Sequence, residues 1–524
     1  MGIPEPRDDN GGSLTVIRRI DRAHPAVVCG LLAILMAAVF VPMSLFRLVD
    51  GDEGTYLFVS RLVVEGQLPY HDFFYPQMFF LPYVYGAWMK LVGYSWYGAR
   101  LLSAALSVIL GLLVYRQVAL VAGTRAWGVL ASVLFAFSSL GFGWYPLIKT
   151  FALPTLLLFA ACAVLSTQSR WRWAASGLLF GLSVACRVYV IGVAPAFLIE
   201  MYLAERGHRA RLMQLARFAV GFVVALLPAE LLFLIDPATF VFNIVGNQVI
   251  RTDYTSVTWW AQKTQAPMQL VAIRSAEGVA SLQFLLLLLV NLAAWVSNAL
   301  ARERPPLASS MAILLILASF VPTPIYTQYF CMPLPFLLVN AVVFCGALTR
   351  ESATPRLRHL LASLLAVHLL VSPLDLYRYT ISGAMVSGIS GHDNVTDWRL
   401  TTIRAVGRAV DHEVRQDRPF VISFWPGYFV ETQAVILPGM ENHFALMFSQ
   451  KVLPREVMRF RLMSYPDLLW HLNQHTVDVV VLGNWTSWTF NREWIRDQLV
   501  QHGYVMKERI ASTEIYTLPS DGHR

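Results

Sequence analysis

A dense group of acidic side chains follows the first long apolar run of this sequence. The segment Asp50-Gly51-Asp52-Glu53-Gly54-Thr55-Tyr56 holds these carboxylates within a few positions. A carboxylate near the positive end of a helix stays ionised, as a general base must. We predict Asp52 as that base, assisted or oriented by Glu53, with Asp50 as a further candidate. Asp50 and Glu53 also have capping-box spacing, which leaves a purely structural role open for Asp50.

A base of this kind suits transfer to an alcohol. It removes the hydroxyl proton while the oxygen attacks an anomeric carbon. If phosphate leaves, little acid help is needed, and one carboxylate suffices where glycosidases use two. The acidic segment therefore predicts transfer of a sugar to a hydroxyl group.

A phosphate-bearing substrate would need positive charge near that base. Arg187 stands between two short apolar runs, and a charge inside a membrane is costly and usually functional. Lys149 follows another apolar run, where its alternative role is to reach the membrane interface. We predict Arg187 and Lys149 as phosphate ligands. Tyr329 could stack on a sugar ring, although aromatic belts at membrane interfaces explain most such residues.

The composition shows what kind of protein must position these side chains. Of its 524 residues, 56% are hydrophobic and only 14% are charged. The mean hydropathy is +0.53. Several apolar runs approach the roughly 20 residues that cross a bilayer as a helix. We predict a polytopic α-helical membrane protein, which excludes a soluble enzyme and a disulfide-stapled secreted module.

About eleven membrane spans are predicted from the apolar runs, with boundaries uncertain by several residues. Together they form a membrane module over residues 26–374, preceded by a cytoplasmic segment, 1–25. The spans are Ala26–Leu48, Trp96–Val121, Ala126–Phe142, Phe151–Leu165, Trp173–Cys186, Val190–Ala204, Leu215–Leu234, Gly278–Ala299, Leu307–Val321, Phe330–Leu348 and Leu360–Leu374.

Arginines mark alternate connections between these spans. Examples are Arg19, Arg125, Arg172, Arg209 and Arg304, which would all lie on one side of the membrane. By the positive-inside rule that side is cytoplasmic. The long connections 49–95 and 236–277 then face outward, and we expect an apolar helix over 57–65 to lie on the membrane surface.

The last quarter of the chain, residues 375–524, has a different composition. Charged residues become frequent, and short apolar runs such as Phe420–Phe424 and Val477–Leu482 alternate with helical patterns. This alternation is typical of a small α/β domain. The topology predicts that the domain is extracytoplasmic.

The first outer connection resembles that of the C-type (GT-C) glycosyltransferases, in the branch of the aminoarabinose transferases and protein O-mannosyltransferases. The resemblance rests on Asp52-Glu53-Gly54-Thr55-Tyr56, on Glu65-Gly66-Gln67-Leu68-Pro69-Tyr70-His71-Asp72-Phe73-Phe74 and on Pro76-Gln77. It continues at 177–187 and at Gln328-Tyr329-Phe330-Cys331-Met332-Pro333. It implies a GT-C fold, and it marks Tyr56, Asp72 and Gln77 as further substrate-binding candidates.

The resemblance also implies a reaction. A polyprenyl-phosphate sugar would donate its sugar, with inversion, on the outer face of a bacterial plasma membrane. The acceptor would be a hydroxyl of a glycan, lipid or protein of the cell envelope. The sequence departs from the family at Gln77-Met78, where aminoarabinose transferases carry a lysine before two prolines, and at Lys149-Thr150, where relatives often have a carboxylate.

Other interpretations remain beside this one. A lipid or sugar transporter, or a flippase, would also have many spans and buried charge, but the paired interrupted helices of transporters are not evident. A third interpretation is a non-catalytic scaffold protein that retains the fold. No certain cofactor is indicated, and a divalent metal ion remains open. Because the basic residues punctuate apolar runs instead of forming one patch, we expect membrane lipids and no nucleic acid as partners.

Overall fold

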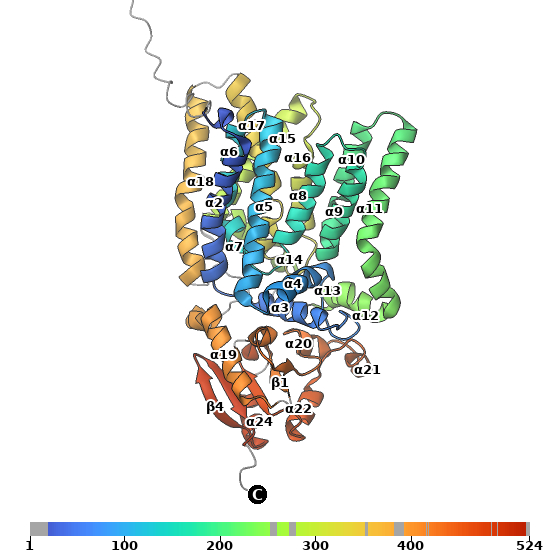
Figure 1. The fold of residues 1–524 in the computed structure, drawn as a ribbon, viewed down its shortest axis with the longest axis vertical. Coiled ribbons are helices and arrows are strands. Elements are labelled where there is room, and N and C mark those ends of the chain that lie inside the picture. The colour runs from blue at the N-terminus through green and yellow to red at the C-terminus, as the bar shows by residue number, and fades with distance from the viewer. Residues whose placement is uncertain are drawn as a thin grey trace, which may run out of the picture.

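The computed structural model contains a long helical bundle, a thin layer of short elements across one end, and a C-terminal domain below that layer (Figure 1). It describes residues 19–251, 259–271, 279–351, 355–381 and 392–519, except 416, 418, 484 and 490. Parts of the predicted N-terminal segment (1–18) and of the second outer connection (252–258 and 272–277) lie outside these residues.

The bundle follows the predicted spans, and its membrane character rests on the length and composition of its helices. Among the described residues, four helices are long and apolar enough to cross a bilayer, namely α2, α5, α11 and residues 282–300 of α15. The bundle consists of α2 (Pro25–Phe46), α5 (Trp96–Ala122), α6 (Arg125–Ala136), α7 (Ser139–Trp144), α8 (Ala152–Leu165), α9 (Arg172–Cys186), η1 (Val188–Val193), α10 (Ala194–Ala204), α11 (His208–Ile235), α15 (Val279–Leu300), α16 (Leu307–Ala318), η3 (Thr327–Cys331), α17 (Leu334–Glu351) and α18 (Pro355–Ile381).

Some boundaries differ from the predicted spans. The predicted span Ala126–Phe142 is two helices. The first, α6, ends at Ala136 with Phe137 as its C-cap, and the second, α7, begins at Ser139. The last helix continues to Ile381, seven residues past the predicted end at Leu374. Helix α9 has only 15 residues and ends at Arg187, whose backbone is extended.

A buried polar cluster ties three helices of the bundle together. The Asn340 amide donates to Asn291 Oδ1 at 2.8 Å, and Ser309 Oγ donates to Asn340 Oδ1 at 2.6 Å. Asn291 in turn donates to the carbonyl of Leu337 at 3.0 Å. Such hydrogen bonds join α15, α16 and α17 where surrounding apolar side chains offer no preference for a partner helix.

The arginine-bearing connections lie together, as the topology predicts. The chain passes from α5 to α6, α8 to α9, α10 to α11 and α15 to α16 at the end of the bundle far from the C-terminal domain (Figure 1). Some of these arginines pair locally. Arg172 forms an ion pair with Glu205 at 2.8 Å, and Arg304 pairs with Glu200.

The layer at the opposite end carries the acidic segment. It consists of α3 (Gly51–Val64), α4 (Phe80–Val92), α12 (Pro237–Val241), the π-helix η2 (Phe242–Gly246), α13 (Asn247–Ile250) and α14 (Trp259–Val271). Nearly all of α3 is buried, because the C-terminal domain covers it. Arg61 at its end donates to the carbonyls of Phe429 and Thr432 at 2.8 and 2.7 Å. The predicted helix at the membrane surface is therefore enclosed between the bundle and the domain.

The C-terminal domain has the predicted α/β architecture. Its elements are η4 (His392–Trp398), α19 (Leu400–Glu413), β1 (Phe420–Ser423), η5 (Pro426–Phe429), β2 (Val435–Ile436), α20 (Ala445–Ser449), α21 (Pro454–Val457), α22 (Tyr465–Asn473), β3 (Val479–Leu482), α23 (Thr486–Thr489), α24 (Arg492–Gln501), β4 (Val505–Ile510) and β5 (Thr513–Thr517). The five strands have the order β2-β1-β3-β5-β4. β1 is parallel to β2 and β3, with Val421 opposite Val479, whereas β5 runs antiparallel to β3 and β4. The continuous apolar run of β3 is buried throughout, as expected for a central strand.

Candidate active site

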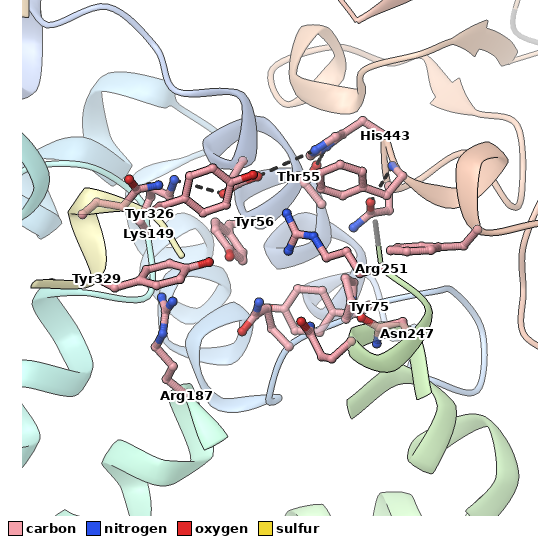
Figure 2. Close-up of a pocket in the computed structure, with 18 of the residues that line it drawn as sticks. Thr55, Tyr56, Tyr75, Lys149, Arg187, Asn247, Arg251, Tyr326, Tyr329 and His443 are labelled. Atoms are coloured by element: carbon pink, nitrogen blue, oxygen red, sulfur yellow. Dashed lines mark hydrogen bonds and ion pairs between the residues drawn. The ribbon is translucent and has the colours of Figure 1, made fainter. Parts of the chain in front are cut away.

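A cavity lies where the bundle, the layer and the C-terminal domain meet (Figure 2). Six of the predicted site residues line it: Asp52, Tyr56, Gln77, Lys149, Arg187 and Tyr329. Asp50, Glu53 and Asp72 are outside its lining. The other residues of the wall are Thr55, Tyr75, Pro76, Phe151, Asn247, Gln248, Arg251, Tyr326, Gln328, Asn442, His443, Phe444 and Phe448.

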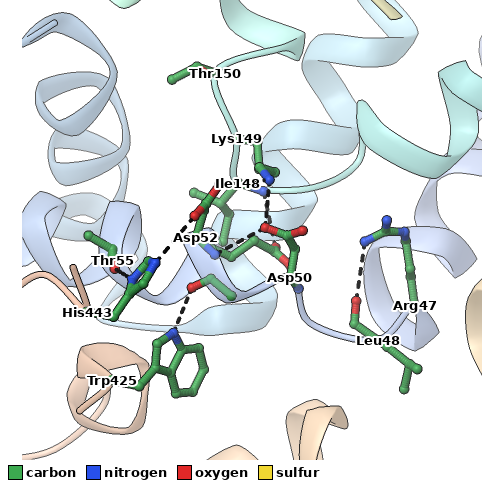
Figure 3. Close-up of polar contacts among 12 residues, drawn as sticks. Arg47, Leu48, Asp50, Asp52, Thr55, Ile148, Lys149, Thr150, Trp425 and His443 are labelled. Carbon is green, nitrogen blue, oxygen red and sulfur yellow. Dashed lines mark hydrogen bonds and ion pairs between the residues drawn. The ribbon is translucent and has the colours of Figure 1, made fainter. Parts of the chain in front are cut away.

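Asp52 is the carboxylate that faces this cavity. It lies in the first turn of α3, and its backbone N–H donates to the Asp50 side chain at 3.1 Å. Its Oδ2 is 3.0 Å from Lys149 Nζ, and its side chain remains 37% exposed. Its Oδ1 is 3.7 Å from His443 Nε2 (Figure 3). Asp52 is therefore held by Lys149 on one oxygen, faces His443 with the other, and is still open to a molecule in the cavity.

The surroundings keep Asp52 ionised. Desolvation favours a higher pKa, but Lys149, followed by His443 and Arg251, outweighs it, so the pKa of Asp52 falls to about 2. The neighbouring Asp50 behaves in the opposite way, because burial raises its pKa to about 6 despite Lys149. The pKa values of Asp50 and Asp52 thus lie on opposite sides of the usual aspartate value, because burial prevails at Asp50 and the nearby cations prevail at Asp52.

Asp50 and Glu53 form the cap of α3. The Asp50 backbone N–H donates to Glu53 Oε1 at 2.9 Å, which completes the capping box. Glu53 is fully buried and forms a two-pronged ion pair with Arg100 of α5, at 2.6 and 2.9 Å. It also accepts the Ile148 N–H at 3.2 Å. This position favours a structural role for Glu53, whose predicted part as a catalytic residue beside Asp52 stays a prediction.

Lys149 binds the acidic turn. Its Nζ is 2.7 Å from Asp50 Oδ1 in addition to its contact with Asp52. Although burial works against its charge, these two carboxylates raise the pKa of Lys149. Its ammonium is therefore already paired with two carboxylates of the protein, and its role as a phosphate ligand stays a prediction.

Arg187 has a different environment. Its guanidinium is buried and lies over the rings of Phe151, Tyr189 and Tyr329, with centroid distances of 4.8, 4.6 and 4.7 Å. Its Nη1 donates to Thr150 Oγ1, whereas its Nε has no hydrogen-bond partner among the described residues. No carboxylate within the described part of the chain forms an ion pair with it. A buried guanidinium that lines a cavity and has an unpartnered N–H can receive an anion there.

Asp72 lies apart from the cavity. Its carboxylate accepts the Leu68 N–H at 2.7 Å and contacts His71 Nδ1 at 2.8 Å. The side chain is 37% exposed. These contacts stabilise the turn after α3, so its position does not support the predicted substrate contact.

The C-terminal domain contributes cavity-lining residues that were not predicted from the sequence. His443 and its neighbours Asn442 and Phe444 come from the connection between β2 and α20. Arg251, after α13, stacks on Phe444 at 4.9 Å. No spacing rule links residues nearly 400 positions apart, so only the interface between domains could reveal them.

A metal site is not evident in the described ranges. Within them, no three side chains of histidine, cysteine, aspartate or glutamate gather closely enough to hold an ion. A requirement for a divalent metal remains open as a prediction.

The arrangement is that of a mostly helical protein with long apolar helices and a small C-terminal α/β domain, as the sequence predicted. The sequence matches no protein-family model and no curated protein.

Solved structures supply the comparison. The chain is similar to ArnT from Cupriavidus metallidurans bound to undecaprenyl phosphate, with a TM-score of 0.64, 12% identity, and coverage of 94% of this chain and 98% of that one. The apo state of ArnT gives a TM-score of 0.63 and 13% identity, covering 93% and 97%. The aminoarabinose transferase fold thus extends over nearly the whole chain, including the C-terminal domain.

Proposed function

We propose that this protein is a membrane glycosyltransferase that moves a sugar from a polyprenyl-phosphate donor to a hydroxyl acceptor. The observation that carries the proposal is one cavity that joins an ionised carboxylate, Asp52, to a caged guanidinium, Arg187. The first group suits removal of a hydroxyl proton, and the second suits a phosphate. The related fold of ArnT, whose structure contains undecaprenyl phosphate, supports this class of donor.

In the proposed reaction, the acceptor hydroxyl lies between Asp52 and the anomeric carbon of the donor. Asp52 takes the hydroxyl proton while the oxygen forms the new bond to that carbon. The bond from carbon to phosphate oxygen breaks, and its electron pair stays on the phosphate. Attack from the face opposite the phosphate inverts the anomeric centre. The Arg187 guanidinium stabilises the charge on the leaving phosphate.

Lys149 supports the base in this scheme. Because it pairs with Asp50 and Asp52, it keeps Asp52 ionised at physiological pH. The aromatic side chains Tyr56, Tyr326 and Tyr329 line the same cavity and offer apolar faces to a sugar ring.

We place the cavity on the extracytoplasmic side of a bacterial plasma membrane. The support is the distribution of arginines, since the connections that carry them lie at the other end of the bundle. The acceptor would then be a glycan, lipid or protein of the cell envelope.

A donor-and-acceptor screen tests the proposal. Purified protein in lipid vesicles is incubated with radiolabelled polyprenyl-phosphate sugars and candidate hydroxyl acceptors, with and without a divalent metal ion. We expect labelled product from wild type and a loss of about 10²- to 10⁴-fold in Asp52→Asn, the usual contribution of a general base. Asp497→Asn, on the exposed face of α24, is the matched control.

Full transfer by the Asp52→Asn variant would refute the assignment of the base. Movement of labelled donor across the vesicle membrane without any product would favour a transporter or flippase instead.

A further inference from the structure

His443 reaches from the C-terminal domain to the turn that carries Asp52. Its side chain is 2% exposed. Its Nδ1 lies 2.9 Å from Thr55 Oγ1, and its Nε2 lies 3.7 Å from Asp52 Oδ1 (Figures 2 and 3). Residues three apart on a helix share a face, so Asp52 and Thr55 both face the same imidazole. The ring therefore bridges two positions of α3.

Aromatic packing fixes the orientation of this ring. The rings of Phe444 and Trp485 lie 4.1 and 4.4 Å from it, and the Trp485 plane is tilted by only 31°. The preceding loop is also held, because Glu441 accepts the Gly439 N–H at 2.8 Å. An imidazole held between two rings cannot turn away from α3 without moving the loop or the domain.

The first turn of α3 is shaped for this contact. A Cβ atom on Gly51 would lie 2.3 Å from the Trp485 ring, and one on Gly54 would lie 2.4 Å from the Trp425 ring. Trp425 Nε1 also donates to the Gly51 carbonyl at 2.7 Å. Glycine at both positions thus permits the C-terminal domain to approach the backbone of the turn that bears Asp52.

We infer that His443 is a positioning residue for Asp52, so that docking of the C-terminal domain completes the catalytic carboxylate. Lys149 holds Oδ2 of Asp52, and His443 faces Oδ1 from the other side. Together they fix the plane in which the carboxylate meets an incoming hydroxyl. This inference rests on the proposed function, since it gives the domain a part in the same reaction.

The protonation of His443 then matters for the rate. An imidazolium would pair with the carboxylate and keep it ionised, as Lys149 does, whereas a neutral imidazole would orient it without adding charge. The charged groups around the ring are Asp52 and Lys149 from the membrane module, Arg251 against the adjacent Phe444, and Glu441 in its own loop. Burial raises the pKa of Glu441 to about 8, so near pH 7 Asp52 is the charged carboxylate that faces the ring.

Kinetics of His443→Gln test the inference, with His412→Gln on exposed α19 as the control. We expect kcat to fall by roughly 10- to 100-fold, the size of a loss from misplacing a reacting group. The KM for the donor should change less than twofold, because His443 does not hold the donor. Because His443 is among the groups that lower the pKa of Asp52, the fall in rate on acidification (the acid limb of the pH profile) should begin at a higher pH in the variant than in wild type. Wild-type kcat with an unchanged acid limb would overturn the inference.

A titration without substrate separates this inference from the proposed function. Histidine labelled with ¹³C at the ε1 position reports the pKa of His443 by NMR in wild type, Asp52→Asn and Thr55→Val. We expect Asp52→Asn to lower the pKa of His443 by about one unit, since an adjacent carboxylate favours the imidazolium. An unchanged pKa would overturn the inference even if transfer is observed. If wild type transfers no sugar, the proposed function fails, and this titration alone decides whether His443 is coupled to Asp52.

Discussion

Two charged regions of the cavity wall are built in opposite ways. At the turn that begins α3, Lys149 pairs with Asp50 and Asp52, and Arg100 pairs with Glu53. Across the cavity, Arg187 has aromatic rings around it and no carboxylate among the described residues. The first region balances its charges within the protein, whereas the second leaves a charge that a ligand can balance. Of these two cavity-lining cations, Arg187 is thus the better candidate to bind an anionic ligand, because Lys149 already has carboxylate partners.

Glu53→Gln should give the largest effect, and it should be on stability. The variant leaves the Arg100 guanidinium fully buried without its carboxylate. Breaking a buried ion pair by removing one partner costs about 3–5 kcal/mol. Thermal unfolding in detergent should show a large loss of stability, whereas Glu493→Gln on exposed α24 should stay near wild type. A stable Glu53→Gln protein would contradict the view that this turn is an internally balanced structural unit.

Arg187→Ala should have the second-largest effect, and we expect it to lower catalytic activity and not stability. We expect kcat/KM for the donor to fall roughly 100-fold, as when one group that stabilises a developing oxyanion is removed. Arg187→Lys should recover part of the activity, because it restores the charge without the planar fork. Steady-state kinetics and binding of polyprenyl phosphate measure the effect. Exposed Arg408→Ala serves as the control, and equal donor binding in both alanine variants would remove Arg187 from the phosphate site.

Lys149→Met should have a smaller effect that depends on pH. Removing the ammonium removes the main cause of the lowered pKa of Asp52, so that pKa must rise. Protonated Asp52 is inactive as a base, and the fall in rate on acidification should therefore begin at a higher pH, by about one unit or more. The KM for the donor should change little. A large rise in that KM would instead return Lys149 to the phosphate-binding role that the sequence predicted.

Asp72→Asn should have the smallest effect. Its carboxylate caps an exposed turn away from the cavity, and exposed contacts of this kind contribute up to about 1 kcal/mol. We expect transfer within twofold of wild type and a slightly lower unfolding temperature. A loss above tenfold would show that Asp72 meets substrate after all.

Much of the fold was accessible from the sequence because a bilayer restricts the backbone to few forms. Apolar runs marked the helices, and Arg125, Arg172 and Arg304 marked one end of the bundle. The break between α6 and α7 was missed, although Ser138-Ser139 interrupts the apolar run there.

The candidate site was only partly accessible. Asp52 and Arg187 could be selected because charge beside apolar runs is costly and therefore conspicuous. The different roles of Glu53 and Asp52 could not be predicted, because they depend on the ion pair between Glu53 and Arg100. Arg100 lies inside a predicted span, where nothing in the sequence indicates this contact. His443 could not be predicted for a similar reason, because its role comes from a contact between the C-terminal domain and α3.

The shortness of α9 has a consequence for the surrounding lipid. Fifteen residues at about 1.5 Å each extend only about 22 Å, whereas the hydrocarbon layer is about 30 Å thick. Local thinning of the bilayer is one way in which a membrane accommodates so short a helix. Where the bilayer thins in this way, a headgroup travelling in the outer leaflet would sink as it neared Arg187, so the depression would guide a long-chain donor sideways into the protein without a pore.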